Sequence, residues 1–321
     1  MIRILRAAQT AFEEPRLDDS WVLPPDTVWI DLVEPTREEE LAVERSLGVL
    51  VPTREEMAEI EASSRLYQED GATFMTATLL HRPDPLDDAP QSGPLTFVLA
   101  GERLVTIRYF EPKSFPIFAD QVGRQPELCA TGVTTFINLM EAVVDRTADN
   151  LEFTSAEVES ISKHIFGRQR IRRFDAVLAR LGRNQTANNK VRDSLVSLAR
   201  LISFAGFAEQ IEHNADARGH LESMQRDIQS LTDHSSHLST NITFLLDAAL
   251  GMINIEQNSI IKIFSVAAVA FMPPTLVASI YGMNFVHMPE LKWMAGYPMA
   301  LCLMAISAAV PLWYFKRKGW L

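Results

Sequence analysis

The stretch "IIKIFSVAAVAFMPPTLVASIYGMNF", residues 260–285, is an apolar run that leads into Gly282, Met283 and Asn284. Lys262 is the one charged residue of its first 22 positions, 260–281. About 20 apolar residues are enough for a helix to cross the hydrocarbon core of a bilayer. The sequence therefore predicts a membrane span with a carboxamide side chain just past its end.

A second apolar run, "MAGYPMALCLMAISAAVPLWYF" at 294–315, follows after a short polar connection. The alternative is a pair of buried helices in a soluble core, but aromatic residues at the borders of both runs favour membrane interfaces. Lys316, Arg317 and Lys318 come directly after the second run, and positive charge gathers on the cytoplasmic side of membranes. We therefore expect two spans, with both termini in the cytoplasm.

The part of the chain before the spans reads as an α/β region and then a helical one. β-Branched and aromatic residues predict strands at 27–32, 72–80, 94–100 and 103–110, Thr36 and Gly48 bound a helix, and Pro, Asp and Gly predict a loop over 82–94. From Gly132 to Tyr281 the pattern is helical, with breaks near Gly167 and Gly206. It predicts two long helices and a longer one that runs directly into the first span.

Composition excludes several classes of protein. The net charge of −11 argues against a nucleic-acid partner, and Cys129 and Cys302 are too far apart to suggest a disulfide framework. There is no phosphate-binding loop, nucleophile elbow or zinc signature, so we expect no enzyme. Acidic residues follow the N-terminus too closely, and its apolar run is too short, for a signal peptide. We therefore expect the α/β region to lie in the cytosol. His234 and His237 could chelate a metal ion, but no third ligand is fixed by spacing.

Steps of three and four residues back from Gly282 follow one face of the long helix, which we call the stripe. Its members are small or polar almost throughout: Gly282, Ser279, Thr275, Met272, Ala268, Ser265, Ile261, Asn258, Asn254, Gly251 and Asp247. Close helix packing explains Ala268 and Ser279. It explains Asn254, Asn258 and Thr275 less well, which favours a water-lined path. Two spans cannot enclose a pore, so a ring of identical subunits is required.

The end of the stripe suits a hydrated divalent cation. Mg²⁺ gives up its water reluctantly, so neutral oxygen dipoles that bond its water shell suit it better than a carboxylate cage. A ring of Asn284 carboxamides, with the carbonyls of Gly282 and Met283, could hold that shell while leaving the ion free to move on.

The run "YGMNF", followed by "MPELKW" and the basic, aromatic end "YFKRKGWL", resembles the CorA family of magnesium channels, and more closely its enterobacterial-type members. The similarity covers residues 245–321 and includes "LLDAALGMINIEQNSIIKIFSV". In the α/β region only "LVTIRYFE" and the overall layout are similar.

The resemblance implies an α+β membrane protein that assembles as a funnel-shaped homopentamer in the bacterial inner membrane. It would pass Mg²⁺ inward, with Co²⁺ and Ni²⁺ as further candidate ions. Carried over to this sequence, the filter is Gly282, Met283 and Asn284, and the acidic inner ring is Asp247. The constrictions are Asn258, Met272 and Thr275; Asn254 and Ser279 line the pore with them, and Lys316, Arg317 and Lys318 surround its inner mouth.

The predicted division of the chain is an α/β domain at 1–130, a helical region with the stalk helix at 131–259, a pore-lining span at 260–281, a periplasmic loop at 282–293, a second span at 294–315 and a basic tail at 316–321. The family is also gated by Mg²⁺ bound through cytosolic carboxylates. From Gly206 to Glu256 there are eight acidic and two basic residues, and Glu222 and Asp227 are candidates that no motif singles out.

Two alternatives remain. A related branch transports zinc, but it departs from the methionine-containing filter. A membrane-anchored sensor of a metal or ligand is of a different class, and it leaves the stripe and Asn284 without a role.

Overall fold

The computed structural model describes residues 1–17, 21–81, 90–167, 173–284 and 288–320. The chain forms two compact units, Met1–Leu246 and Asp247–Leu321, which are described separately. The domain division predicted from the sequence, with boundaries after residues 130 and 259, stays a prediction. The sheet and most of the predicted helical region lie together in the first unit.

The first unit contains a six-stranded sheet with the order β1-β2-β6-β5-β4-β3. Its strands are β1 Ile2–Arg6, β2 Thr27–Val33, β3 Leu66–Glu69, β4 Ala72–His81, β5 Gln91–Ala100 and β6 Arg103–Arg108. Neighbouring strands are antiparallel except for the central pair β2 and β6. Asp70 and Gly71 connect β3 to β4, and both have positive φ, as the two central residues of a tight type I′ hairpin turn require.

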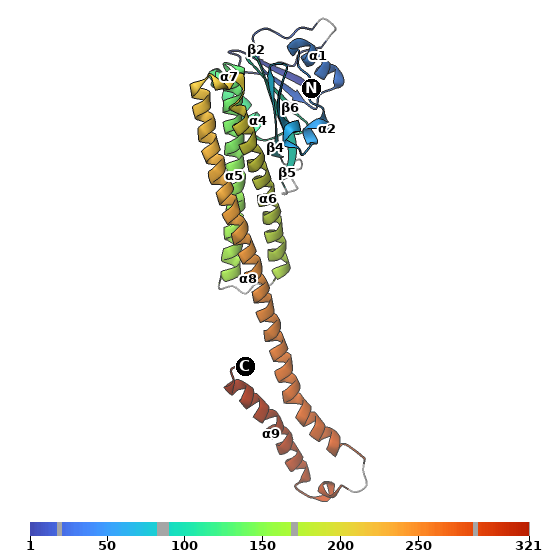
Figure 1. Cartoon of the computed structure of the whole chain (residues 1–321). Helices are drawn as coiled ribbons and strands as arrows, with labels where there is room; N and C mark the ends of the chain where they lie inside the picture. Colours follow the sequence, from blue (N-terminus) through green and yellow to red (C-terminus); the bar gives the residue numbers. More distant parts are fainter. Residues whose placement is uncertain (18–20, 82–89, 168–172, 285–287, 321) are drawn as a thin grey trace. The chain divides into compact units, whose positions relative to one another are not determined.

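Both faces of the sheet are covered (Figure 1). On one face Ile30, Leu32 and Val105 pack with Val43 of α1 (Arg37–Leu47) and Met57 of α2 (Arg54–Ala58). The other face packs against α4 (Ser114–Val122), α5 (Gly132–Phe166) and α6 (Phe174–Ala205) through buried aromatic and aliphatic side chains. Short elements complete the connections: α3 Ala62–Arg65, η1 Pro126–Cys129 and α7 Glu209–Glu212.

A buried ion pair joins the two parallel strands. Arg108 on β6 donates from Nη2 to Asp31 Oδ2 at 2.8 Å and from Nε to Asp31 Oδ1 at 3.0 Å. The same Oδ1 accepts from Thr106 Oγ1 at 2.7 Å, and Thr106 in turn accepts from the Trp29 indole at 3.0 Å. Asp31 and Arg108 are 2% and 1% exposed, so these bonds replace the water that both charges lose on folding.

The long helices agree with the breaks read from the sequence. The residue after α5 is Gly167, the residue after α6 is Gly206, and α8 runs from Ala215 to Tyr281. In the first unit, α8 is joined to α6 by a buried pair: Asn188 Nδ2 donates to the Ser235 carbonyl at 2.9 Å and Ser235 Oγ donates to Asn188 Oδ1 at 3.1 Å.

The predicted strands are confirmed, and so is the helix between Thr36 and Gly48, where a capping box begins α1 and a left-handed Gly48 ends it. The predicted loop over 82–94 is wrong at its end, because residues 91–94 belong to β5 and pair with β4; residues 82–89 lie outside the described part. Pro94 fits there because β6 pairs with β5 only from Leu95 onward, which leaves Pro94 at an open edge.

The second unit consists of the end of α8, a short turn η2 (Pro289–Lys292) and α9 (Gly296–Arg317). Both long helices contain windows apolar enough to cross a membrane, and about one residue in ten or fewer of each window is buried, 11% in α8 and 6% in α9. Core helices of a soluble protein would be mostly buried, so the soluble alternative does not fit.

We expect Asp31→Ala to destabilise the first unit by about 3–5 kcal/mol, because it leaves the Arg108 charge buried without its main partner. The measurement is denaturant unfolding of the full chain in detergent, followed by near-UV circular dichroism. Glu111→Gln is the matched control: Glu111 also pairs with Arg108, at 2.6 Å, but is half exposed, so its loss should cost about 1 kcal/mol or less. Equal small losses in both variants would contradict the account.

Candidate functional site

The stripe is a continuous exposed face on the part of α8 that belongs to the second unit. All of its residues from Asp247 to Gly282 are exposed in the single chain, including Asn254, Asn258 and Thr275. Thr275 Oγ1 donates to the Phe271 carbonyl at 2.8 Å, so its hydroxyl oxygen remains available as an acceptor. Nothing in the described part of this unit covers the stripe.

The residues of α8 that are buried or half buried lie on the opposite face. Four of these residues are buried or half buried within the unit: Val266, Ala270, Pro273 and Val277. Each lies two positions before a residue of the stripe, which are, in the same order, Ala268, Met272, Thr275 and Ser279. Two residues correspond to about 200° around a helix. The covered face of α8 and the stripe therefore lie on opposite sides of the helix.

The helix ends at the predicted filter. The Gly282 N–H donates to the Ala278 carbonyl at 2.9 Å and the Met283 N–H to the Ile280 carbonyl at 3.2 Å, which closes the last turn. A Cβ on Gly282 would lie 3.1 Å from the Ala278 oxygen, tighter than ordinary contact. Asn284 follows with an exposed side chain, and residues 285–287 lie outside the described part. The carboxamide is thus placed just past the end of the exposed stripe.

Two prolines lie inside the helix, at Pro273 and Pro274. Proline has no N–H, so the carbonyls of Val269 and Ala270 lack their usual helical donors. Free carbonyls in a span are tolerated where water or neighbouring helices can reach them.

The predicted basic ring lies beside aromatic side chains at the end of α9. Arg317 is 5.5 Å from the centre of the Trp313 ring, and Lys318 is 5.9 Å from that of Tyr314. Lys262 of α8 lies 5.9 Å from the Trp320 ring, so the same end of both helices carries cations and aromatics. This combination is typical of a membrane–water interface.

The predicted regulatory carboxylates do not converge within one chain. Glu222 and Asp227 are both exposed on α8, but five residues place them on different faces. Asp227 belongs instead to an acidic group with α5: the pKa of Asp145 is raised, first by its partial burial and then by the negative charges of Glu141, Asp149 and Asp227. Glu141 also pairs with His220 at 2.7 Å.

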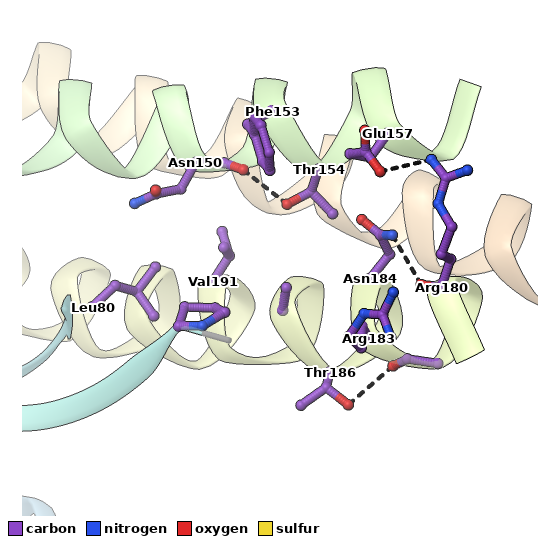
Figure 2. Close-up of a pocket in the computed structure, with 13 residues that line it drawn as sticks. Leu80, Asn150, Phe153, Thr154, Glu157, Arg180, Arg183, Asn184, Thr186 and Val191 are labelled. Carbon is purple, nitrogen blue, oxygen red and sulfur yellow. Dashed lines mark hydrogen bonds and ion pairs between the residues drawn. The ribbon is translucent and has the colours of Figure 1, made fainter. Parts of the chain in front are cut away.

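No group of three metal-ligating side chains gathers in the described residues, and His234 and His237 are exposed. A cavity of about 380 Å³ lies between α5 and α6 (Figure 2). Its Glu157 and Arg180 pair with each other at 2.8 Å, and Thr154 and Asn184 bond to carbonyls of their own helices. The sequence predicted no site there, and most of its polar groups satisfy one another.

Residues 25–317 match the family described as CorA-like Mg²⁺ transporter protein. The chain belongs to the CorA family. It is 36% identical over 295 residues to the magnesium transport protein CorA of Yersinia pseudotuberculosis, and 36% identical over 299 residues to that of Escherichia coli K12; each alignment covers 92% of both chains. The family is one of transporters, which confirms the prediction that the chain is not an enzyme.

Two solved structures match nearly the whole chain, and a third matches most of it. The complete CorA magnesium transporter from Methanocaldococcus jannaschii matches with a TM-score of 0.78 at 18% identity, over 100% of this chain and 99% of that one. Full-length CmaX matches with a TM-score of 0.72 at 13% identity, over 98% and 96%. The ZntB cytoplasmic domain from Vibrio parahaemolyticus matches with a TM-score of 0.58 at 8% identity, over 79% and 98%. The likeness to the complete CorA structure confirms the predicted α+β membrane fold, with a soluble α/β domain, a long helix and two apolar C-terminal helices.

We expect a cysteine on the stripe to react with a charged, water-soluble methanethiosulfonate, and one on the opposite face not to react. Ser265→Cys and Ile263→Cys form the matched pair, because both positions are exposed in the single chain at the same depth but differ by about 200° around α8. The measurement is labelling of the assembled protein in membranes.

The labelling needs a Cys302→Ala background, because Cys302 is exposed on α9. Cys129 can stay, since it is buried and burial raises its pKa to about 11, which leaves little reactive thiolate. Equal labelling of both introduced cysteines would contradict a one-sided water path.

Proposed function

We propose that this chain forms a passive Mg²⁺ channel of the bacterial inner membrane, built as a homopentamer with both termini in the cytoplasm. The observation that carries the proposal is the exposed stripe of α8, which lies opposite α9 and leads to Asn284 in a member of a family of Mg²⁺ transporters. The relatives that are 36% identical are named magnesium transport proteins, which supports Mg²⁺ as the ion.

The stripe needs a partner of its own kind. In a bilayer, the hydroxyls of Ser265, Thr275 and Ser279 within the span are costly against lipid, and the carboxamides of Asn254 and Asn258 continue the same face on the cytosolic side of the span. Since α9 covers the opposite face of α8, other copies of α8 are the groups that can enclose the stripe. A closed ring then presents the same side chains at each level, with Met272 as an apolar collar and Asp247 at the inner end.

Asn284 acts on the hydrated ion. Carboxamide oxygens accept hydrogen bonds from the water shell of Mg²⁺ without adding negative charge, so the ion is selected but not trapped. Gly282 lets the backbone end its helix close to this ring, and its carbonyl and that of Met283 supply further acceptors.

The membrane potential supplies the driving force. A divalent ion that enters a cytosol at −100 mV gains about 4.6 kcal/mol, twice the roughly 2.3 kcal/mol of one elementary charge. Inward flow then needs no ATP, and the chain has no phosphate-binding loop. Co²⁺ and Ni²⁺ carry the same charge and are further candidate substrates.

Internal Mg²⁺ closes the channel by binding cytosolic carboxylates. The pKa of Asp145 is raised first by its partial burial and then by the negative charges of Glu141, Asp149 and Asp227. A bound cation would relieve that repulsion, which supports this proposal. Glu222 lies on a different face of α8 from Asp227. It can help to bind Mg²⁺ only together with a carboxylate of a neighbouring copy. Lys316, Arg317 and Lys318 fix the cytoplasmic end of α9 at anionic lipid headgroups.

The alternatives have less support. For the zinc branch, the support is a similarity of fold to the ZntB cytoplasmic domain at 8% sequence identity. The relatives that are 36% identical to this chain are named magnesium transport proteins. A sensor held by its spans has no use for the exposed carboxamides of α8.

We expect Asn284→Asp to reduce Mg²⁺ uptake at least about tenfold while assembly is retained, because a ring of carboxylates binds and partly dehydrates the ion. The measurement is uptake into liposomes loaded with a Mg²⁺ indicator. Asn189→Asp, the same change at an exposed position of α6, is the control and should leave uptake unchanged. Unchanged uptake in Asn284→Asp protein would remove Asn284 from the filter.

Removal of internal Mg²⁺ should raise the open probability and expose amides of α8 to hydrogen exchange, because the freed carboxylates repel one another. Glu222→Gln with Asp227→Asn should shift the Mg²⁺ concentration needed for closure. The double variant Asp145→Asn with Asp227→Asn leaves Glu222 unchanged, so it tests the acidic group around Asp145 independently of Glu222. A channel whose conductance and amide exchange both ignore internal Mg²⁺ would sink the gating proposal and leave the pore proposal standing.

A further inference from the structure

A cavity of about 330 Å³ lies at the β3 edge of the sheet, where α6 packs on β4. Arg65 at the end of α3 and Arg192 and Arg200 on α6 line it. Asp193 is the one carboxylate among its lining residues. The lining is therefore positively charged, although the whole chain has a net charge of −11.

The guanidinium group of Arg65 is held in position. Its Nη1 donates to Thr78 Oγ1 at 3.1 Å, and its Nε donates to the Glu59 carbonyl. The Thr78 N–H donates to Ser197 Oγ at 2.9 Å, which ties β4 to α6 beneath the cavity. A side chain fixed in this way loses little freedom when it binds a ligand.

These arginines have no ion-pair partner in the described part of the chain, whereas Arg180 on the same helix pairs with Glu157 at 2.8 Å. The pKa of Arg65 is lowered, first by burial and second by the positive charge of Arg200. Like charges held near each other, with one of them partly buried, cost free energy that a bound anion would recover.

Apolar side chains border the same cavity. Ile60 is 90% exposed and Val196 is 39% exposed, and Leu66 of β3 lies beside them. The cavity thus offers guanidinium groups for an anion and an apolar rim for the rest of a ligand.

We propose that this cavity binds a small ligand that carries a chain of phosphate groups. The planar fork of arginine donates two parallel hydrogen bonds to a pair of phosphate oxygens, and three such groups suit a diphosphate or triphosphate better than one isolated carboxylate. The volume is at the lower end of the roughly 300–1,000 Å³ typical of small-molecule sites. Binding here does not depend on ion transport.

The test is isothermal titration calorimetry on the full chain in detergent, in Mg²⁺-free buffer, with pyrophosphate and with ATP. We expect saturable binding of at least one of them that weakens as salt is added. Tighter binding of ATP assigns the site to nucleotides, and equal binding assigns it to inorganic phosphate chains; both results support the site. No saturable binding of either probe overturns it.

The Arg192→Gln, Arg200→Gln double variant should bind about 100-fold more weakly or worse, since one charged hydrogen bond contributes about 10- to 150-fold. Both side chains are exposed, so the fold should survive. Arg183→Gln is the control, because Arg183 is an exposed arginine of the same helix that lines a different cavity. A double variant that binds as the parent does, whether or not its oligomer size changes, overturns the proposal.

Discussion

Hydrocarbon cannot solvate a polar side chain, and this constraint organises the membrane unit. Within the span, the stripe of α8 carries hydroxyls that have to be kept away from lipid, and its carboxamides continue the same face beyond the inner end of the span. Within the described part of this unit the covered side chains of α8 lie on its other face, so no contact within the chain does this. The stripe must face water or other copies of itself, and a ring of subunits satisfies both conditions at once. The proposed assembly, the proposed water path and the proposed role of Asn284 all rest on that one requirement.

The sheet unit meets a similar requirement in a different way. Asp31 and Arg108 are buried charges, but they satisfy each other across two parallel strands, and Thr106 and Glu111 add further hydrogen bonds to the pair. The arginines beside β3 have no such carboxylate partner in the described residues. In the acidic group around Asp145, Glu141 pairs with His220 and Asp149 with Arg146, but the pKa of Asp145 is still raised by burial and by its acidic neighbours. Unbalanced charge of both signs therefore remains on the first unit, where anions and cations from the solution can bind it.

Local signals predicted much of the fold. Thr36 and Gly48 bound α1 through cap geometry, and Gly167 and Gly206 follow the ends of α5 and α6. The short edge strands β1 and β3 were not predicted, and the loop over 91–94 was wrong, because pairing with β4 outweighs its turn residues. Helical spacing found the stripe. Interactions between distant positions, such as the ion pair of Asp31 with Arg108 or the hydrogen bond of Arg65 with Thr78, leave no local signal and needed the structure.

The central claim is that copies of α8 enclose a path for Mg²⁺ driven by voltage alone. The most direct measurement is Mg²⁺ entry into sealed liposomes that contain the purified chain, with a potassium diffusion potential set stepwise from zero to inside-negative and no nucleotide present. We predict entry that rises as the inside is made more negative and falls when the inside is made positive. Correctly oriented, oligomeric protein that admits no Mg²⁺ at any potential, or whose entry ignores the potential, would contradict the account.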